Sequence, residues 1–231
     1  MAKLSAEDIR SFSYLSDIGG TDKPFSIPLI YRFLIRFLSP LVRFFFNINY
    51  SGLERIPSKG AMIITSNHVS NLDPIFKILA ARRHVFYLAK EDHFQKQPNK
   101  FIMSSNGMIE TIRSEGGKDA LSRAHDVLTS GLAIGIFPEG TRSRNVKPPF
   151  LQDGKTGVAR LAASFPDIPV VPICIIGSRE VMPPGANFIR FWKAIEIHIG
   201  EPVTFGEWLI SNDGGDSVSY THLTLPTTYG V

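Results

Sequence analysis

The sequence predicts an α/β protein with a largely parallel central sheet flanked by helices, preceded by an amphipathic, membrane-associated helical segment. Three observations support this prediction. Short apolar runs recur from about residue 50 onward, helical patterns alternate with them, and a long apolar stretch with a line of arginines precedes both. Strands and helices in alternation are typical of parallel sheets whose faces are covered by helices.

Composition limits the classes of protein that need to be considered. The 231 residues, 43% of them apolar, are enough for one domain with a substantial core. Cys174 is the single cysteine, which excludes a disulfide framework, and the six histidines show no metal-binding spacing. The net charge of +4 favours anionic partners, either phosphate-bearing small molecules or an anionic membrane.

Four regions follow one another along the chain. We predict a loose leader over residues 1–26, a membrane-associated helical segment over residues 27–49 and an α/β domain over residues 50–212. Residues 213–231 contain "VSYTHLTLPTT", which is typical of translated adapter sequence. We therefore expect a non-native or disordered tail there and exclude it from the fold.

The stretch "IPLIYRFLIRFLSPLVRFFFNINY" carries its arginines on one side. On a helix with about 100° per residue, Arg32, Arg36 and Arg43 fall on one narrow stripe. A spanning helix has no reason to hold three arginines in a line through hydrocarbon, whereas a helix lying in the interface places them against lipid phosphates. Pro40 is expected to kink or split this helix. A core helix with a basic stripe and a transmembrane span are the alternatives.

The elements of the α/β domain follow from apolar periodicity. Helices are predicted over residues 74–83, 118–131 and 157–165. Strands are predicted over residues 61–66, 84–89, 107–112, 132–137 and 169–176. Ligand sites in such sheets gather beyond the carboxyl ends of the strands, and two polar segments follow strands here.

The first polar segment is "SNHVSNLDP", which contains His68 and Asp73. One interpretation is structural: Asp73 caps the next helix and Pro74 takes its first position. That interpretation explains Asp73 but not His68. Five residues on a helix correspond to about 140° of rotation, so the pair meets only if the loop folds back. In that case the carboxylate would fix the imidazole tautomer and make the ring a better base.

The second polar segment is "FPEGTRSR", residues 137–144. Gly140 allows close approach of the backbone, Arg142 offers donors suited to phosphate, and Glu139 could orient an arginine or a backbone amide. A surface turn with a solvated charge pair is the alternative. Lys155 lies downstream, just before a predicted helix whose N-terminal amides also attract anions.

Taken together, the segments resemble the glycerolipid (lysophospholipid) acyltransferase family, closest to its bacterial lysophosphatidic acid acyltransferases. The four blocks that carry the resemblance occur in the family's order, and a further segment, "FLQDGKTGVARLA", follows the third. The blocks are "SNHVSNLDP", "GMIETIRSEGG" with Gly107 and Arg113, "FPEGTRSR", and "IPVVPICIIG" with Pro172. The resemblance covers residues 50–205.

The resemblance implies transfer of an acyl group from acyl-CoA or acyl-ACP to the free hydroxyl of lysophosphatidic acid, giving phosphatidic acid for phospholipid biosynthesis. His68 would be the general base and Asp73 its orienting partner, without an acyl-enzyme. The acceptor would be bound by Arg113, Glu139, Gly140, Thr141, Arg142 and Lys155.

No metal or redox cofactor is expected, and no nucleic-acid partner. The expected partners are membrane lipids and the acyl donor, at the cytoplasmic face of the inner membrane. Two alternatives stay open. One is a relative that uses another acceptor, such as glycerol-3-phosphate or another lysolipid. The other is a membrane lipid-binding protein without turnover.

Overall fold

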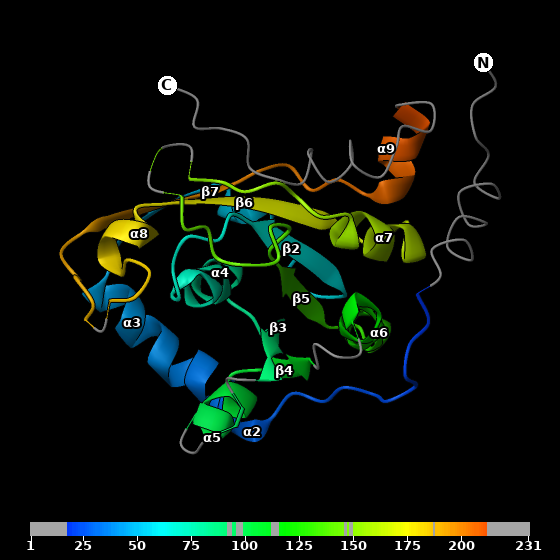
Figure 1. Cartoon of the computed structure of the whole chain (residues 1–231), viewed down its shortest axis with the longest axis horizontal. Helices are drawn as coiled ribbons and strands as arrows, with labels where there is room; N and C mark the ends of the chain where they lie inside the picture. Colours follow the sequence, from blue (N-terminus) through cyan, green and yellow to red (C-terminus); the bar gives the residue numbers. More distant parts are fainter. Residues whose placement is uncertain are drawn as a thin grey trace.

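The computed structural model describes residues 18–91, 94–95, 99–111, 116–145, 147, 150–186 and 188–211. It confirms the predicted α/β fold, with a seven-stranded sheet in the order β1-β7-β6-β2-β5-β3-β4 (Figure 1). All neighbouring strands pair in parallel except β6 and β7. The strands are β1 Asn47–Ser51, β2 Met62–Ser66, β3 Val85–Lys90, β4 Met108–Thr111, β5 Ala133–Ile136, β6 Val170–Ile176 and β7 Ala194–Ile199.

Helices cover both faces of this sheet, and each face has its own apolar core. Helices α2, α3, α4 and α8 contribute buried or partly buried residues to one core, and α6, α7 and α9 to the other. Figure 1 shows α4 and α6 on opposite sides of β5. The helical elements are α2 Leu29–Phe33, η1 Leu34–Leu38, α3 Ser39–Phe45, η2 Leu53–Arg55, α4 Asp73–Ala81, α5 Asn99–Ser105, α6 Gly116–Thr129, α7 Gly157–Ser164, α8 Ser178–Val181 and α9 Phe205–Ser211.

The N-terminal helical run is continuous from Leu29 to Phe45, so Pro40 does not split it. Proline cannot donate to the preceding turn and its ring crowds the carbonyl four residues earlier. The run accommodates this with a π-helical segment, Leu34–Leu38, immediately before Pro40. The helix ends at Phe45 and not at residue 49 as predicted, because residues 47–51 form β1 and pair with β7.

One face of this helical run packs against the core. Tyr31 and Phe46 are buried, and Ile35 and Val42 pack beside them. The Tyr31 hydroxyl donates to the Val85 carbonyl at 2.8 Å and accepts from the Val85 amide at 3.1 Å, which fixes α2 to the start of β3. Gly107 makes room for the Tyr31 ring, since a Cβ there would lie 2.6 Å from it.

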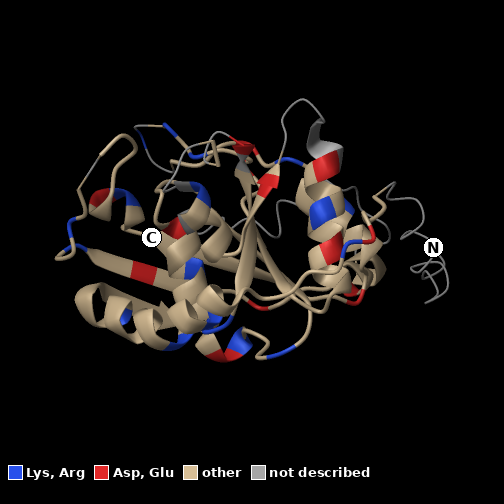
Figure 2. Ribbon diagram, turned by 90° about the horizontal axis from the view of Figure 1, so that it is seen from below, with Lys and Arg blue, Asp and Glu red and all other residues tan. Residues whose placement is uncertain are grey.

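The opposite face exposes large apolar side chains to solvent. Phe33 is 60% exposed, Phe37 62% and Phe44 83%, and Leu29, Leu41 and Phe45 are exposed beside them. We call these six residues the apolar face. In Figure 2 the run is tan and blue without red, because its charged residues are all arginines. Within the described part of the chain, no helix combines the length and apolar character needed to cross a bilayer.

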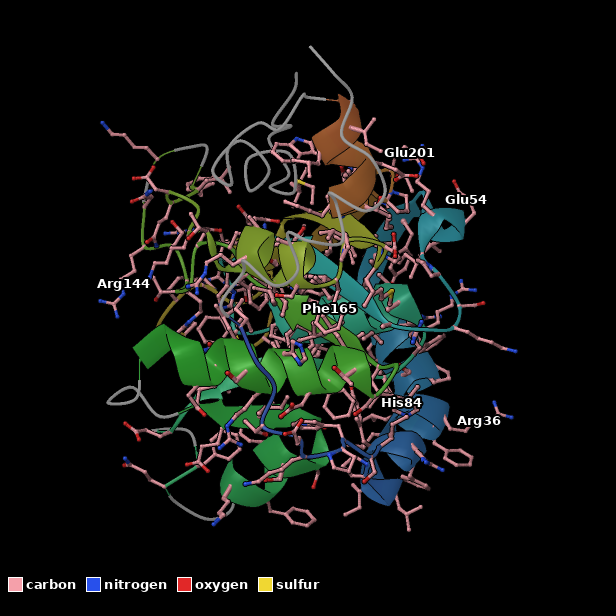
Figure 3. All side chains as sticks on the ribbon, turned by 90° about the vertical axis from the view of Figure 1, so that its right-hand side faces the viewer. Arg36, Glu54, His84, Arg144, Phe165 and Glu201 are labelled. Carbon is pink, nitrogen blue, oxygen red and sulfur yellow. The ribbon has the colours of Figure 1, made fainter. Side chains whose placement is uncertain are left out.

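The predicted arginine stripe divides into two parts. Arg32 and Arg36 are exposed, and Arg36 extends away from the body of the protein (Figure 3). Arg43 instead donates to the Leu79 carbonyl in α4 and lies over the Tyr50 ring. The interpretation of all three arginines as lipid-facing is therefore wrong for Arg43, which fixes α3 to the domain.

Residues 18–26 pack on the α/β domain and do not form the loose leader that the sequence predicted. The Thr21 amide donates to Asp126 in α6 at 2.8 Å, and the Phe25 amide donates to the Ser130 hydroxyl. The Phe25 ring meets Phe86 of β3 edge-on. Residues 1–17 and the predicted tail, residues 213–231, lie outside the described residues.

Candidate active site

Two loops that follow neighbouring parallel strands build the site, as the sequence predicted. Strand β2 leads into the loop with His68, and β5 leads into the loop with Glu139. Thr65 and Ile136, near the ends of these strands, are partners in the sheet. Asn67 adds the third strand, because its side-chain amide exchanges two hydrogen bonds with the Ile175 backbone in β6.

The loop after β2 folds back so that His68 and Asp73 meet. Their Nδ1 and Oδ2 atoms lie 2.9 Å apart. The same carboxylate oxygen accepts the backbone amides of Val69 and Ser70, each at 2.7 Å. An oxygen that accepts two amides can take a third hydrogen bond only as an acceptor. Nδ1 of His68 therefore carries the proton, and Nε2 is left as the basic nitrogen.

The prediction that Asp73 is an N-cap is wrong. Asp73 is the first residue of α4, with Pro74 second, and no side chain caps this helix. Its carboxylate accepts from residues that precede it, whereas an N-cap accepts from residues that follow it. Asp73 is fully buried. The residue therefore shapes the loop and holds the imidazole.

Glu139 joins the two loops through backbone amides. Its Oε1 accepts from the His68 amide at 2.8 Å, and its Oε2 accepts from the Gln152 amide at 2.9 Å. Of the two roles considered for this residue, the orientation of backbone amides is the one that the described contacts support. Burial raises the pKa of the Glu139 carboxyl to about 7, although both amides oppose the shift.

Phe137 supports the imidazole from behind, a role that the sequence did not suggest. The His68 and Phe137 rings stack with centroids 3.8 Å apart and planes inclined by 16°. The Ser143 amide also donates to the His68 carbonyl at 2.7 Å. Backbone, carboxylate and ring contacts therefore hold His68 from three directions. The location of Phe137 directly after a buried strand was the available signal.

The electrostatic surroundings keep His68 unprotonated near neutral pH. Burial lowers the pKa of the imidazole, and the positive charges of Lys77 and Arg142 lower it further. The hydrogen bond and the charge of Asp73 oppose this shift. The His68 side chain retains 16% exposure. A general base must be unprotonated and within reach of its substrate, and His68 meets the first condition.

The remaining candidate residues lie on the loop after β5 and before α7. Gly140 has a positive φ of 69°, and a Cβ there would lie 3.0 Å from the Lys155 Nζ. Thr141 and Lys155 are exposed and Arg142 is half-buried. Arg144 points outward (Figure 3). Arg113 lies outside the described residues.

In the described part of the chain, neither a cysteine nucleophile nor a metal site finds support. Burial raises the pKa of the Cys174 thiol to about 11, which keeps it protonated. Three or more His, Cys, Asp or Glu side chains never gather there in a way that suits a metal ion.

Comparison with known proteins decides the family. A family model described as Acyltransferase matches residues 47–176, which include both loops of the site. The chain belongs to the acyltransferase family. The match begins at β1 and ends at β6, so the helical run Leu29–Phe45 precedes it.

Two relatives of the chain carry the same description. The chain is 31% identical to a chloroplastic 1-acyl-sn-glycerol-3-phosphate acyltransferase of Arabidopsis thaliana over 162 residues. This alignment covers 69% of the chain and 44% of that protein. Over 98 residues, 41% of the chain, it is 34% identical to a 1-acyl-sn-glycerol-3-phosphate acyltransferase of Borreliella burgdorferi, and covers 38% of it. The chain therefore spans less than half the length of these relatives.

The fold is shared with a solved structure. The crystal structure of the 1-acyl-sn-glycerophosphate (LPA) acyltransferase PlsC from Thermotoga maritima aligns with a TM-score of 0.60 at 21% identity. The alignment covers 82% of the present chain and 80% of the PlsC chain. The arrangement of sheet and flanking helices is therefore shared with the PlsC structure.

Proposed function

We propose that this protein transfers a fatty acyl group from acyl-CoA or acyl-ACP to the free hydroxyl of lysophosphatidic acid, giving phosphatidic acid. The 2.9 Å contact between His68 and Asp73 carries the proposal, because it orients a half-buried imidazole and leaves Nε2 as its basic nitrogen. The descriptions of the relatives from Arabidopsis thaliana and Borreliella burgdorferi support the choice of acceptor.

In the proposed reaction His68 Nε2 removes the proton from the acceptor hydroxyl as its oxygen attacks the thioester carbonyl carbon. The C–S bond then breaks, and the imidazolium returns the proton to the departing thiolate. Asp73 stabilises the imidazolium and keeps the ring in the correct tautomer. No covalent acyl-enzyme forms, because the substrate hydroxyl is itself the nucleophile.

The acceptor phosphate is assigned to the loop after β5. Arg142 is close enough to lower the pKa of His68, and an arginine there can hold a phosphate with paired hydrogen bonds. Lys155 lies beside Gly140 and adds a second cation. Thr141 contributes an exposed hydroxyl, and Arg113 stays a candidate from the resemblance. Glu139 acts on the acceptor indirectly, by holding the two loops together.

We place the protein on the cytoplasmic face of the inner membrane. The apolar face would enter the outer part of the acyl region, while Arg32 and Arg36 would meet lipid phosphates. Isolated apolar side chains on a surface are ordinary, but a contiguous helical face of this kind marks an interaction site.

A panel of acceptors tests the proposal. The protein is reconstituted on anionic vesicles and given labelled acyl-CoA or acyl-ACP with lysophosphatidic acid, glycerol-3-phosphate, lysophosphatidylcholine or water alone. Phosphatidic acid is expected as the principal product, identified by mass spectrometry. Acylation of glycerol-3-phosphate or lysophosphatidylcholine alone would contradict the assigned acceptor. Vesicle binding without consumption of either donor would indicate a lipid-binding protein.

A further inference from the structure

Lys77 is a buried lysine directly behind the candidate active site. It lies on α4, four residues after Asp73, and its side chain is fully buried. Residues four apart share one face of a helix, so Lys77 is one turn below the carboxylate. Among the described residues, no carboxylate lies within ion-pair distance of its Nζ. Its Nζ donates a hydrogen bond to the Ile136 carbonyl at 3.4 Å.

Aromatic rings surround the ammonium group of Lys77. Its Nζ lies 3.6 Å from the centroid of the Phe137 ring and 5.0 Å from that of Tyr87. The His68 imidazole already covers one face of Phe137 at 3.8 Å. The ammonium must therefore occupy the opposite face, which places the phenyl ring between the cation and the base. A desolvated cation on an aromatic face is a favourable electrostatic contact.

The sequence makes space for this arrangement at Gly135. A Cβ at this position of β5 would lie 2.1 Å from the Tyr87 ring. Any larger residue would displace Tyr87, which is the second ring beside Lys77. Among the residues that the structure describes, neither the buried Tyr87 hydroxyl nor Oδ1 of Asp73 has a hydrogen-bond partner. Polar groups that are left unpaired in a core call for a compensating role.

We propose that Lys77 is a positioning residue for His68: its ammonium group holds the Phe137 ring against the imidazole, and its positive charge opposes protonation of that imidazole. The role in turnover rests on the proposed acyl transfer. The effect on the His68 ring rests only on the contacts above and can be measured without turnover.

The charged groups around His68 come from several elements. Asp73 and Lys77 belong to α4, Arg142 and Glu139 belong to the loop after β5, and Tyr87 belongs to β3. Asp73 raises the pKa of His68, whereas Lys77 and Arg142 lower it. Burial raises the pKa of Tyr87 well above its ordinary value, so this phenol stays neutral. Lys77 and Arg142 are therefore the cations that act on the imidazole, and Lys77 alone is fully buried.

Replacement of Lys77 by methionine removes the charge and keeps the length of the side chain. Loss of a nearby positive charge raises the pKa of His68, so the acidic limb of kcat/KM should move up by about one pH unit. Activity at pH 8 should fall less than activity at pH 6, because His68 is unprotonated at pH 8 in both proteins and only the loss of ring positioning remains there. Lys77→Arg should restore the wild-type midpoint. Lys59→Met, at an exposed position before β2, is the matched control and should not move it.

Thermal unfolding separates this role from a merely structural one. Burial lowers the pKa of Lys77 well below its ordinary value, so the folded state penalises the ammonium form. Lys77→Met should therefore raise the Tm at neutral pH, and the gain should shrink as the pH rises towards about 10.4. A lower Tm with an unchanged pH profile would show that Lys77 only fills space and would overturn the proposal.

A direct titration keeps the two proposals distinguishable. The His68 ring is followed through its imidazole nitrogen chemical shifts in labelled protein, with His68→Ala used to assign the signal. A higher His68 pKa in Lys77→Met supports the coupling even if no acyl acceptor is ever found. An unchanged His68 pKa would refute the coupling even if the wild type makes phosphatidic acid.

Discussion

The β2–α4 loop and the N-terminal helical run reverse the ordinary distribution of side chains in opposite ways. In and next to the loop, polar and charged residues are buried: Asn67 in the loop, and Asp73 and Lys77 on α4, are 1% exposed or less. On the helical run, large apolar residues face solvent, with Phe44 at 83% exposure. Buried polar groups are tolerated when they are paired, and exposed apolar groups when they meet a partner.

The two regions differ in where their unusual side chains find contact partners. The polar groups of the loop find their partners inside the protein, because one Asp73 oxygen accepts hydrogen bonds from an imidazole and two backbone amides. The apolar face has no such internal partner among the described residues, while its opposite face is packed on the core. Changes in the loop should therefore alter chemistry at constant membrane binding, and changes on the apolar face should do the reverse.

The largest effect is expected from Asp73→Asn. An amide can donate where the carboxylate accepts, so the imidazole is free to take the wrong tautomer, and a fall in kcat of about 10²–10⁴-fold should follow. Vesicle binding should be unchanged. Asn71→Ala, at an exposed position in the same loop, serves as control. Wild-type kcat in Asp73→Asn would remove the carboxylate from the mechanism.

The double variant Phe33→Ser/Phe37→Ser tests the apolar face. Two rings that enter lipid should contribute about 1.5 kcal/mol each, so vesicle affinity should fall roughly 100-fold. The Tm should change little, because both side chains are exposed. Ile210→Ser, an exposed apolar change on α9, should not affect binding. Equal affinity of the double variant and the wild type in a co-sedimentation assay would refute the membrane contact.

The double variant Arg32→Gln/Arg36→Gln tests the electrostatic part of the same membrane contact. Each arginine near an anionic surface contributes about 1 kcal/mol, so binding to anionic vesicles should weaken about 10- to 30-fold. The difference from the wild type should shrink at high salt, because ions screen exposed charges. Lys59→Gln removes a cation elsewhere and should have a small effect. A difference that persists on neutral vesicles would contradict an electrostatic role.

The smallest effect is expected from Glu139→Gln. The glutamine side chain has one oxygen in place of two, so it can accept from the backbone amide of His68 or of Gln152 but not from both. This loss should lower the free energy of unfolding by about 1–2 kcal/mol. Activity should fall roughly 10-fold through poorer placement of His68. Denaturant unfolding and kcat/KM are measured beside the exposed Glu110→Gln. Unchanged stability would argue against the link between the loops.

Continuous apolar runs made much of the sheet predictable. Strands β2, β3, β4, β5 and β6 lie within one or two residues of their predicted ranges. Strand β7 alternates buried and exposed residues and pairs antiparallel with β6, so it lacks that signal. Strand β1 follows the apolar helix directly, so the prediction included most of it in that helix. Its pairing with β7, 147 residues further along the chain, makes it a strand.

The site was predictable where its chemistry is local. The pairing of His68 with Asp73 was predicted, because one loop between a strand and a helix contains both. The role of Lys77 was not, because Phe137 and Tyr87, which enclose it, come from distant parts of the chain. Similarly, the contact of Arg43 with α4 depends on packing that no helical wheel contains.

The most direct test compares phosphatidic acid formation by the wild type and His68→Ala, on the same anionic vesicles and at saturating acyl donor. We predict a loss of about 10²–10⁴-fold in kcat with unchanged vesicle binding and Tm. Transfer at the wild-type rate by His68→Ala would contradict the assignment of this imidazole as the base.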